Sequence, residues 1–213
     1  MSVEVLCAPL GDLAANTYIV TDKATGLTAV VDPGAESEEL LSYLKDKQVK
    51  YILLTHGHFD HIMGAGSVKR LTNAEIAIHS LDADCLQDGE KSLFVHHFAG
   101  EQEKLTADIL LSEGDILNLG ETEIKVMHTP GHTVGGCCYI IEGDRIIFSG
   151  DTLFKLSAGR TDFAGGSARQ ELMSLSRLAE LSGDYSVFPG HGEATTLDFE
   201  RAHNRYVKIR GNR

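Results

Sequence analysis

Three histidines and one aspartate are crowded into six residues of this chain. His56, His58, Asp60 and His61 lie directly after the apolar run Tyr51–Leu54. Imidazole and carboxylate groups are costly to bury without a partner, so the end of a buried strand is expected to hold them only around a cation. The spacing therefore predicts a metal site, and the fold must bring further ligands to this point.

Three later segments also place a potential metal ligand directly after an apolar run. His132, Asp151 and His191 each follow an apolar, strand-like run and each stands beside a glycine. Loops that leave strand ends are where folds built on sheets gather functional side chains. We therefore expect these three residues to complete the site begun at His56.

The spacing divides the ligands into two sets. Side chains two apart in an extended loop point the same way, which groups His56 with His58, whereas Asp60 and His61 lie at the turn into the next helix. The set expected to hold one divalent ion is His56, His58 and His132, and the set expected to hold a second is Asp60, His61 and His191. Asp151 is the expected bridge between the ions.

Two divalent ions about 3.5–4 Å apart generate hydroxide near neutral pH, polarise a carbonyl and stabilise the oxyanion that follows. The pattern thus predicts a hydrolase, with Asp60 and Asp151 as the carboxylates closest to the chemistry. Imidazole and carboxylate ligands without thiolate suit zinc, iron or manganese. We place zinc first.

Bulk properties narrow the class further. A chain of 213 residues with 42% hydrophobic and 23% charged residues is typical of a globular protein, and we expect residues 1–213 to form one domain. A net charge of −12 opposes binding to nucleic acid. No segment resembles a membrane span or a secretory signal, so we expect a cytoplasmic protein without disulfides that acts on a small molecule. The oligomeric state is left open.

The hydrophobic pattern predicts an α/β chain in which strands and amphipathic helices alternate. Expected helices span 38–47, 66–71, 81–87, 167–181 and 196–206, and expected strands span 17–20, 28–31, 49–54, 75–79, 109–111, 116–119, 123–128, 137–141, 145–149 and 185–188. Segment 88–107 is expected to be a loop. Strand-rich stretches in both halves favour two packed sheets with helices outside.

The motif His-x-His-x-Asp-His at 56–61, followed in order by His132, Asp151 and His191, resembles that of the metallo-β-lactamase-fold hydrolases. The resemblance covers nearly the whole chain. It implies a four-layered αββα sandwich with a dinuclear site at one edge of the two sheets.

Within that superfamily the chain looks most like glyoxalase II, the hydroxyacylglutathione hydrolase. The segments that carry this likeness are Asp32–Gly34, His128–Thr133, Gly150–Phe154 and Phe188–Gly192. The resemblance implies a thioester hydrolase in which a metal-bridging hydroxide attacks the acyl carbonyl and the thiolate leaves. It also implies that Asp32 orders the ligand loop, although Asp32 could instead only cap the following turn.

Two departures leave glutathione recognition open. The sequence has no counterpart of the C-terminal helical extension of the longer enzymes, and Gly159–Asp162 stands where those enzymes have Lys-Phe-Tyr. Arg160 could clamp a substrate carboxylate or pair with Asp162. Phe154 could line the substrate site or belong to the core. His128 is expected to serve hydrogen bonding or packing.

Other functions remain open. Persulfide dioxygenases share the implied fold and a stretch like Gly159–Phe163, and their resemblance implies a single iron on His56, His132 and Asp151. Hydrolases of lactones, β-lactams or other esters could use the same site. A nuclease is disfavoured by the acidic charge, and a non-enzymatic metal protein by the complete ligand set.

Overall fold

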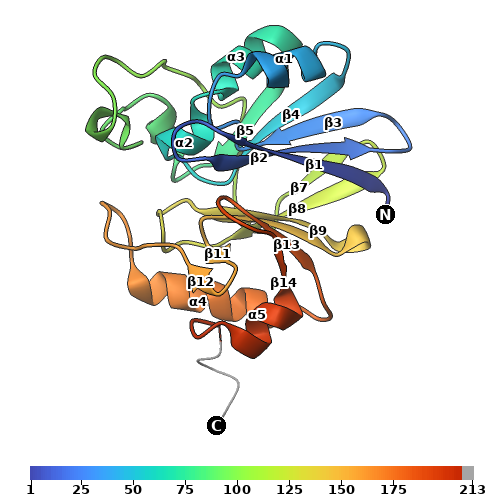
Figure 1. Ribbon diagram of the computed structural model, residues 1–213, viewed down its shortest axis with the longest axis vertical. Coiled ribbons are helices and arrows are strands. Elements are labelled where there is room, and N and C mark those ends of the chain that lie inside the picture. Colours follow the sequence, from blue (N-terminus) through green and yellow to red (C-terminus); the bar gives the residue numbers. More distant parts are fainter. Residues whose placement is uncertain (208–213) are drawn as a thin grey trace.

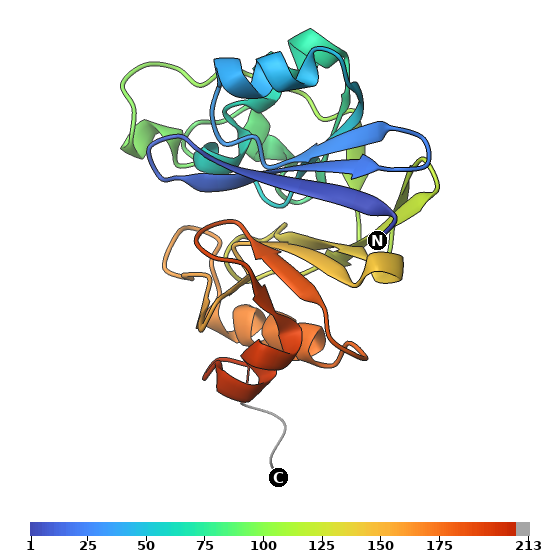
Figure 2. The ribbon, with the colours of Figure 1, turned by 45° about the vertical axis from the view of Figure 1, so that its right-hand side comes forward.

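Two six-stranded sheets pack face to face, and helices cover the outer face of each (Figure 1). The structure is a computed structural model, and it describes residues 1–207. Turning the molecule shows the same four layers from another side (Figure 2). The predicted αββα sandwich is therefore confirmed.

The first sheet has the strand order β1-β2-β3-β4-β5-β6. Its strands are β1 (Val3–Leu10), β2 (Ala15–Asp22), β3 (Leu27–Val31), β4 (Gln48–Leu54), β5 (Glu75–His79) and β6 (Ile109–Leu111). The first three are antiparallel, and β3 to β6 are parallel. Parallel neighbours need crossovers, and the helices α1 (Glu38–Leu44), α2 (Phe59–Ile62) and α3 (Ala65–Thr72) lie in these connections.

The second sheet has the order β14-β13-β10-β9-β8-β7. Its strands are β7 (Ile116–Leu119), β8 (Thr122–His128), β9 (Cys137–Ile141), β10 (Ile146–Gly150), β13 (Ser186–Pro189) and β14 (Thr195–Thr196). The helix α4 (Ala168–Ala179) connects the parallel pair β10 and β13, and α5 (Leu197–His203) follows β14. A small hairpin of β11 (Leu153–Phe154) and β12 (Ser157–Ala158) stands after β10.

Three apolar clusters separate the layers. The central one fills the space between the sheets, and the other two lie under α1 and α3 and under α4 and α5. Two tyrosines of the central cluster also tie the sheets by hydrogen bonds: Tyr139 of β9 donates to the carbonyl of Leu54, and Tyr18 of β2 donates to the carbonyl of Pro189, each at 2.7 Å. Leu54 and Pro189 are the last residues of strands that lead into ligand loops.

Most expected elements are present within one or two residues of their predicted ends, and Ser37 and Ser167 cap α1 and α4 through their side chains. The helix predicted at 81–87 was wrong, because only a 3-10 helix at Ala83–Leu86 forms there. The edge strand β1 was not predicted, since its apolar residues alternate weakly. The helix predicted at 196–206 ends at His203. Across residues 1–207 no helix combines the length and apolarity that a membrane span requires.

We predict that Tyr139→Phe lowers the free energy of unfolding by about 1–3 kcal/mol, because it removes the hydroxyl donor of the buried Leu54 carbonyl and leaves it the weaker Cys137 thiol at 3.9 Å. Equilibrium urea denaturation in the presence of a chelator measures this change. Tyr43→Phe, at a tyrosine exposed on α1, is the control and should leave stability unchanged. Equal stability of the two variants would contradict the proposed tie between the sheets.

Candidate metal centre

All seven predicted ligands lie together at one edge of the two sheets. They come from the loop after β4, the loop between β8 and β9, and the loops after β10 and β13. Within residues 1–207, three groups of potential ligand side chains each have ligand atoms within 4.8 Å of one another; two contain only predicted ligands, and the third joins Asp32 to His56 and His61. The members are His56, His58 and His132 in the first group, and Asp60, His61 and His191 in the second. These are the two sets that the sequence predicted.

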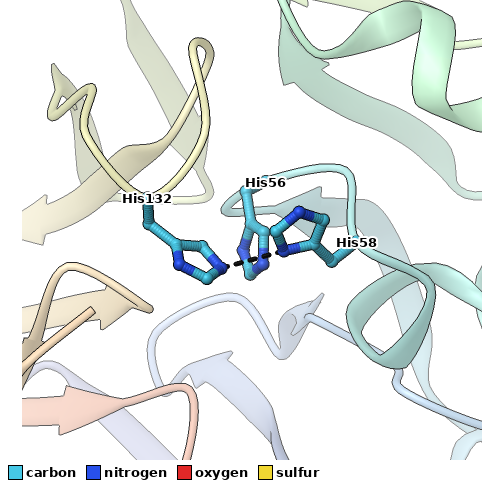
Figure 3. A group of neighbouring side chains, drawn as sticks. All are labelled: His56, His58 and His132. Carbon is cyan, nitrogen blue, oxygen red and sulfur yellow. Dashed lines mark hydrogen bonds between the residues drawn. The ribbon is translucent and has the colours of Figure 1, made fainter. Parts of the chain in front are cut away.

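The first group consists of three buried imidazoles (Figure 3). His56 and His58 come from the loop after β4, and His132 reaches them from the other sheet. Nδ1 of His58 lies 2.8 Å from Nε2 of His132. Three ring nitrogens facing one point are a suitable ligand set for a divalent transition metal.

The second group lies beside the first and is less enclosed, since the side chain of His191 is 28% exposed. Nε2 of His191 lies 3.1 Å from a carboxylate oxygen of Asp60 and 3.2 Å from Nε2 of His61. The helix α2 starts at Phe59, so its first turn carries both Asp60 and His61.

Asp151 lies between the two groups. One carboxylate oxygen is 3.5 Å from Nε2 of His132, and the other is 3.5 Å from Nε2 of His61. A carboxylate that reaches both groups in this way has the position expected of a bridging ligand.

Hydrogen bonds on the far side of the rings fix which nitrogen faces the centre. Nδ1 of His132 lies 2.7 Å from the carbonyl of Arg160, and Nδ1 of His191 lies 3.2 Å from the carbonyl of Leu13. A carbonyl oxygen can only accept, so each Nδ1 carries a proton, and Nε2 of each ring presents its lone pair when the ring is neutral. Such partners orient metal-binding histidines in many proteins.

Asp32 orients side chains and backbone of the loop after β4. Its buried carboxylate accepts hydrogen bonds from the Thr55 backbone N–H at 2.7 Å, from the Thr55 hydroxyl at 2.6 Å and from Nδ1 of His61 at 3.0 Å. The Thr55 hydroxyl in turn lies 3.1 Å from Nδ1 of His56. Asp32 therefore orders the ligand loop, as the resemblance implied.

This arrangement leaves lone pairs that need a positive partner. Nε2 of His61 and Nε2 of His191 face each other, although both rings have committed Nδ1 elsewhere. Nε2 of His56 and one oxygen of Asp151 are buried and have no hydrogen-bond partner within residues 1–207. Buried polar atoms without partners are rare in folded proteins. Divalent cations fit these atoms.

The electrostatics agree with a cation site. Burial lowers the pKa of His56 well below its usual range, and burial together with His132 lowers the pKa of His58 to about 3, which favours the neutral form that a metal ligand requires. Burial also lowers the pKa of His61, but Asp151, Asp60 and Asp32 outweigh it and raise the pKa to about 10. The carboxylates around His61 thus favour positive charge at this point.

The candidate substrate residues lie around the centre. Phe163 packs against the ring of His58 with 5.6 Å between ring centroids, and the Arg160 guanidinium lies 4.1 Å over Phe163. Arg160 makes a bidentate ion pair with Asp162, with both contacts at 2.7 Å, so the predicted pairing is present. The ring of Phe154 lies beside the second group, with 6.3 Å between its centroid and that of His191.

Other residues lie apart from the centre. His128 stacks on His79 and contacts the carbonyl of Val134, so its predicted role in packing and hydrogen bonding is confirmed. Two buried acids near the ligand loops were missed: Asp82 accepts hydrogen bonds from loops of both sheets, and Glu171 of α4, whose pKa burial raises to about 8, lies under Gly131. Nothing in their sequence context separates them from surface acids.

The profile of the Metallo-beta-lactamase superfamily matches residues 10–191. The chain is 30% identical over 220 residues to "Hydroxyacylglutathione hydrolase GloC" of Haemophilus influenzae, covering 97% of this chain and 98% of that protein. The crystal structure of BLEG-1 B3 metallo-β-lactamase superposes with a TM-score of 0.87 at 32% identity, covering 96% of this chain and 99% of the other. That of TTHA1623 in a di-iron-bound form gives a TM-score of 0.83 at 31% identity, with 94% and 99% covered.

This chain therefore belongs to the metallo-β-lactamase superfamily. With its histidine and aspartate clusters, its class is that of metal-binding hydrolases.

We predict that Gly190→Ala impairs metal binding at the centre. A Cβ on Gly190 would lie 2.3 Å from a carboxylate oxygen of Asp151 and 2.7 Å from Cε1 of His61, so both side chains must move. Displacing these oriented side chains should weaken affinity for divalent ions by about 10- to 100-fold. Competition with a chromophoric chelator measures this loss.

Gly143→Ala is the matched control, because a Cβ there meets nothing within 4 Å. It should bind metal as the unchanged protein does. Unchanged metal affinity in Gly190→Ala would contradict the assignment of Asp151 and His61 as neighbouring ligands.

Proposed function

We propose that this protein is a dinuclear metal-dependent hydrolase of small acyl thioesters. The observation that carries the proposal is the pair of ligand groups with Asp151 between them, each contact lying at 3.5 Å. One group alone would suit a single ion. Two groups joined by a carboxylate suit two ions that act on one substrate.

In this proposal one ion is held by His56, His58 and His132, and the other by Asp60, His61 and His191. Asp151 is a ligand of both. Zinc is our first choice, with iron or manganese as alternatives, and a di-iron-bound relative of similar structure supports keeping iron. When bound, such ions supply a hydroxide at neutral pH and stabilise charge on the carbonyl oxygen.

The chain's own residues position the substrate and shield the centre. Phe163 covers the ring of His58 and presents an apolar wall to the acyl group. Arg160 stands over that wall, exposed at the surface, where it can exchange Asp162 for a substrate carboxylate. Phe154 provides a second wall beside His191. The chemistry requires no nucleophile from the protein.

The thioester class rests on the similarity to the Haemophilus influenzae hydroxyacylglutathione hydrolase, which covers nearly all of both chains. The likeness to a B3 metallo-β-lactamase favours β-lactams as the second candidate. Lactones and other esters present the same kind of carbonyl. A persulfide dioxygenase with one iron would leave His58, Asp60, His61 and His191 without a ligand role, which the close approach of these side chains argues against.

We predict that His58→Ala lowers kcat/KM for a hydroxyacyl thioester such as S-lactoylglutathione by more than about 100-fold, since removing even the partners that orient metal ligands costs about 10- to 100-fold. The purified chain should contain two divalent ions, and the variant should lose one. Elemental analysis and thioester hydrolysis, measured on the same sample, test both expectations.

His96→Ala, at an exposed histidine away from the centre, is the control and should retain metal and activity. β-Lactam and lactone hydrolysis and oxygen uptake with glutathione persulfide are measured on the same protein. One iron with oxygen uptake, or two ions with turnover of β-lactams but of no thioester, would contradict the proposal.

We further predict opposite shifts from the two partners of the surface ion pair. Arg160→Gln should raise KM for a thioester that carries a carboxylate about tenfold with little change in kcat, because a charged bidentate contact is lost. Asp162→Asn should lower KM, since it removes the competing carboxylate. Steady-state kinetics measure both effects.

Arg169→Gln, at an exposed arginine of α4, should leave KM unchanged. For thioesters without a carboxylate, KM should be the same in all three variants as in the unchanged protein. A common shift of KM for charged and uncharged substrates would contradict carboxylate recognition by Arg160.

A further inference from the structure

Asp82 is buried at 1% exposure, although nothing in the sequence marks it as functional. It follows β5 and lies between the two halves of the molecule. One carboxylate oxygen accepts from the Gly57 backbone N–H at 3.1 Å and from the Thr133 hydroxyl at 2.7 Å. The other accepts from the Gly135 backbone N–H at 2.7 Å. These three donors satisfy the carboxylate, and Asp82 makes no salt bridge within residues 1–207.

The donors come from both loops that build the first metal group. Gly57 stands between His56 and His58 in the loop after β4. Thr133 and Gly135 follow His132 in the loop between β8 and β9. The two loops belong to different sheets, and Asp82 joins them through one carboxylate.

Both glycines allow this close approach. A Cβ on Gly135 would lie 2.6 Å from the Asp82 backbone nitrogen and from its carboxylate. A Cβ on Gly57 would lie 2.4 Å from Cβ of Cys85 and 3.1 Å from the Asp82 carbonyl oxygen. The backbone of Asp82 is itself fixed, since its N–H donates to His79 and its carbonyl accepts from Cys85, each at 3.0 Å.

His58 depends most on such support. The rings of His56, His61, His132 and His191 each have a partner on Nδ1, whereas Nδ1 of His58 faces the centre and Nε2 has no hydrogen bond in the described part of the chain. Apart from its contact with His132 and the packing of Phe163, His58 is therefore held through its backbone, and Asp82 binds that backbone at the preceding residue, Gly57.

We propose that Asp82 is a positioning residue for the metal ion of the first group: its carboxylate sets the distance between the loop of His56 and His58 and the loop of His132. This inference rests on the ligand groups assigned in the proposed function. It does not depend on the substrate. Within residues 1–207 the hydrogen-bond partners of Asp82 include no ligand of the second group, so we expect its main effect at one ion.

The test measures zinc affinity with a chromophoric chelator in two backgrounds. His191→Ala impairs the second group and leaves the first to report, while His58→Ala impairs the first. In the His191→Ala background, Asp82→Asn should weaken zinc binding by about 10- to 100-fold, because an amide cannot accept from all three donors. In the His58→Ala background, it should cause no further loss.

Asp22→Asn is the matched control. Asp22 is also fully buried, and it accepts from the Thr25 backbone N–H at 2.8 Å, the Thr25 hydroxyl at 2.7 Å and the Thr122 hydroxyl at 2.7 Å, at the end of β2 away from the ligand loops. Its substitution should lower the thermal midpoint as Asp82→Asn does, and zinc affinity should not change.

Thr133→Val provides a milder variant in case Asp82→Asn does not fold. It removes one donor of Asp82 without placing a polar group there, and it should weaken zinc binding at the first group by a smaller factor. Unchanged affinity in both Asp82→Asn and Thr133→Val, equal loss in the two backgrounds, or an equal loss in Asp22→Asn would overturn the proposal. Because zinc affinity is measured in the absence of substrate, failure to hydrolyse thioesters would count only against the proposed function.

Discussion

The crowding of imidazole lone pairs is the constraint on which this structure depends. Nε2 of His61 and of His191 lie 3.2 Å apart, and Nδ1 of His58 and Nε2 of His132 lie 2.8 Å apart. Neutral rings held this way repel unless a cation or proton lies between them. The fold must therefore hold loops from two sheets together against that repulsion. Hydrogen bonds to the ring nitrogens that face away from the centre provide part of this support.

Support for the centre comes mainly from groups that do not face it. Tyr139 and Tyr18 tie the strand ends on which ligand loops begin, and Asp32 holds Thr55 and His61. Backbone carbonyls of Leu13 and Arg160 set the rings of His191 and His132. Rigidity of this kind reduces the reorganisation that binding a metal would otherwise require.

The sequence was sufficient to predict the layers and which histidines and aspartates lie together, because both depend on local signals. Apolar runs mark strands, and histidine spacing in His56–His61 marks a centre. The partners behind the ligands were harder to predict. Asp82 lies in a segment predicted to be helical, and its donors are 25, 51 and 53 residues away in sequence. Backbone carbonyl partners such as those of Arg160 and Leu13 cannot be predicted from sequence, since every residue has a carbonyl. The single-domain organisation and cytoplasmic location stay predictions.

The carbonyl and the guanidinium of Arg160 make separate contacts near the centre. Its carbonyl accepts from His132, whereas its guanidinium stands at the surface over Phe163. A main-chain contact survives replacement of the side chain. Residue 160 can therefore change chemically over evolution or by design, and the range of accepted molecules can drift at this loop while the histidine behind it keeps its orientation.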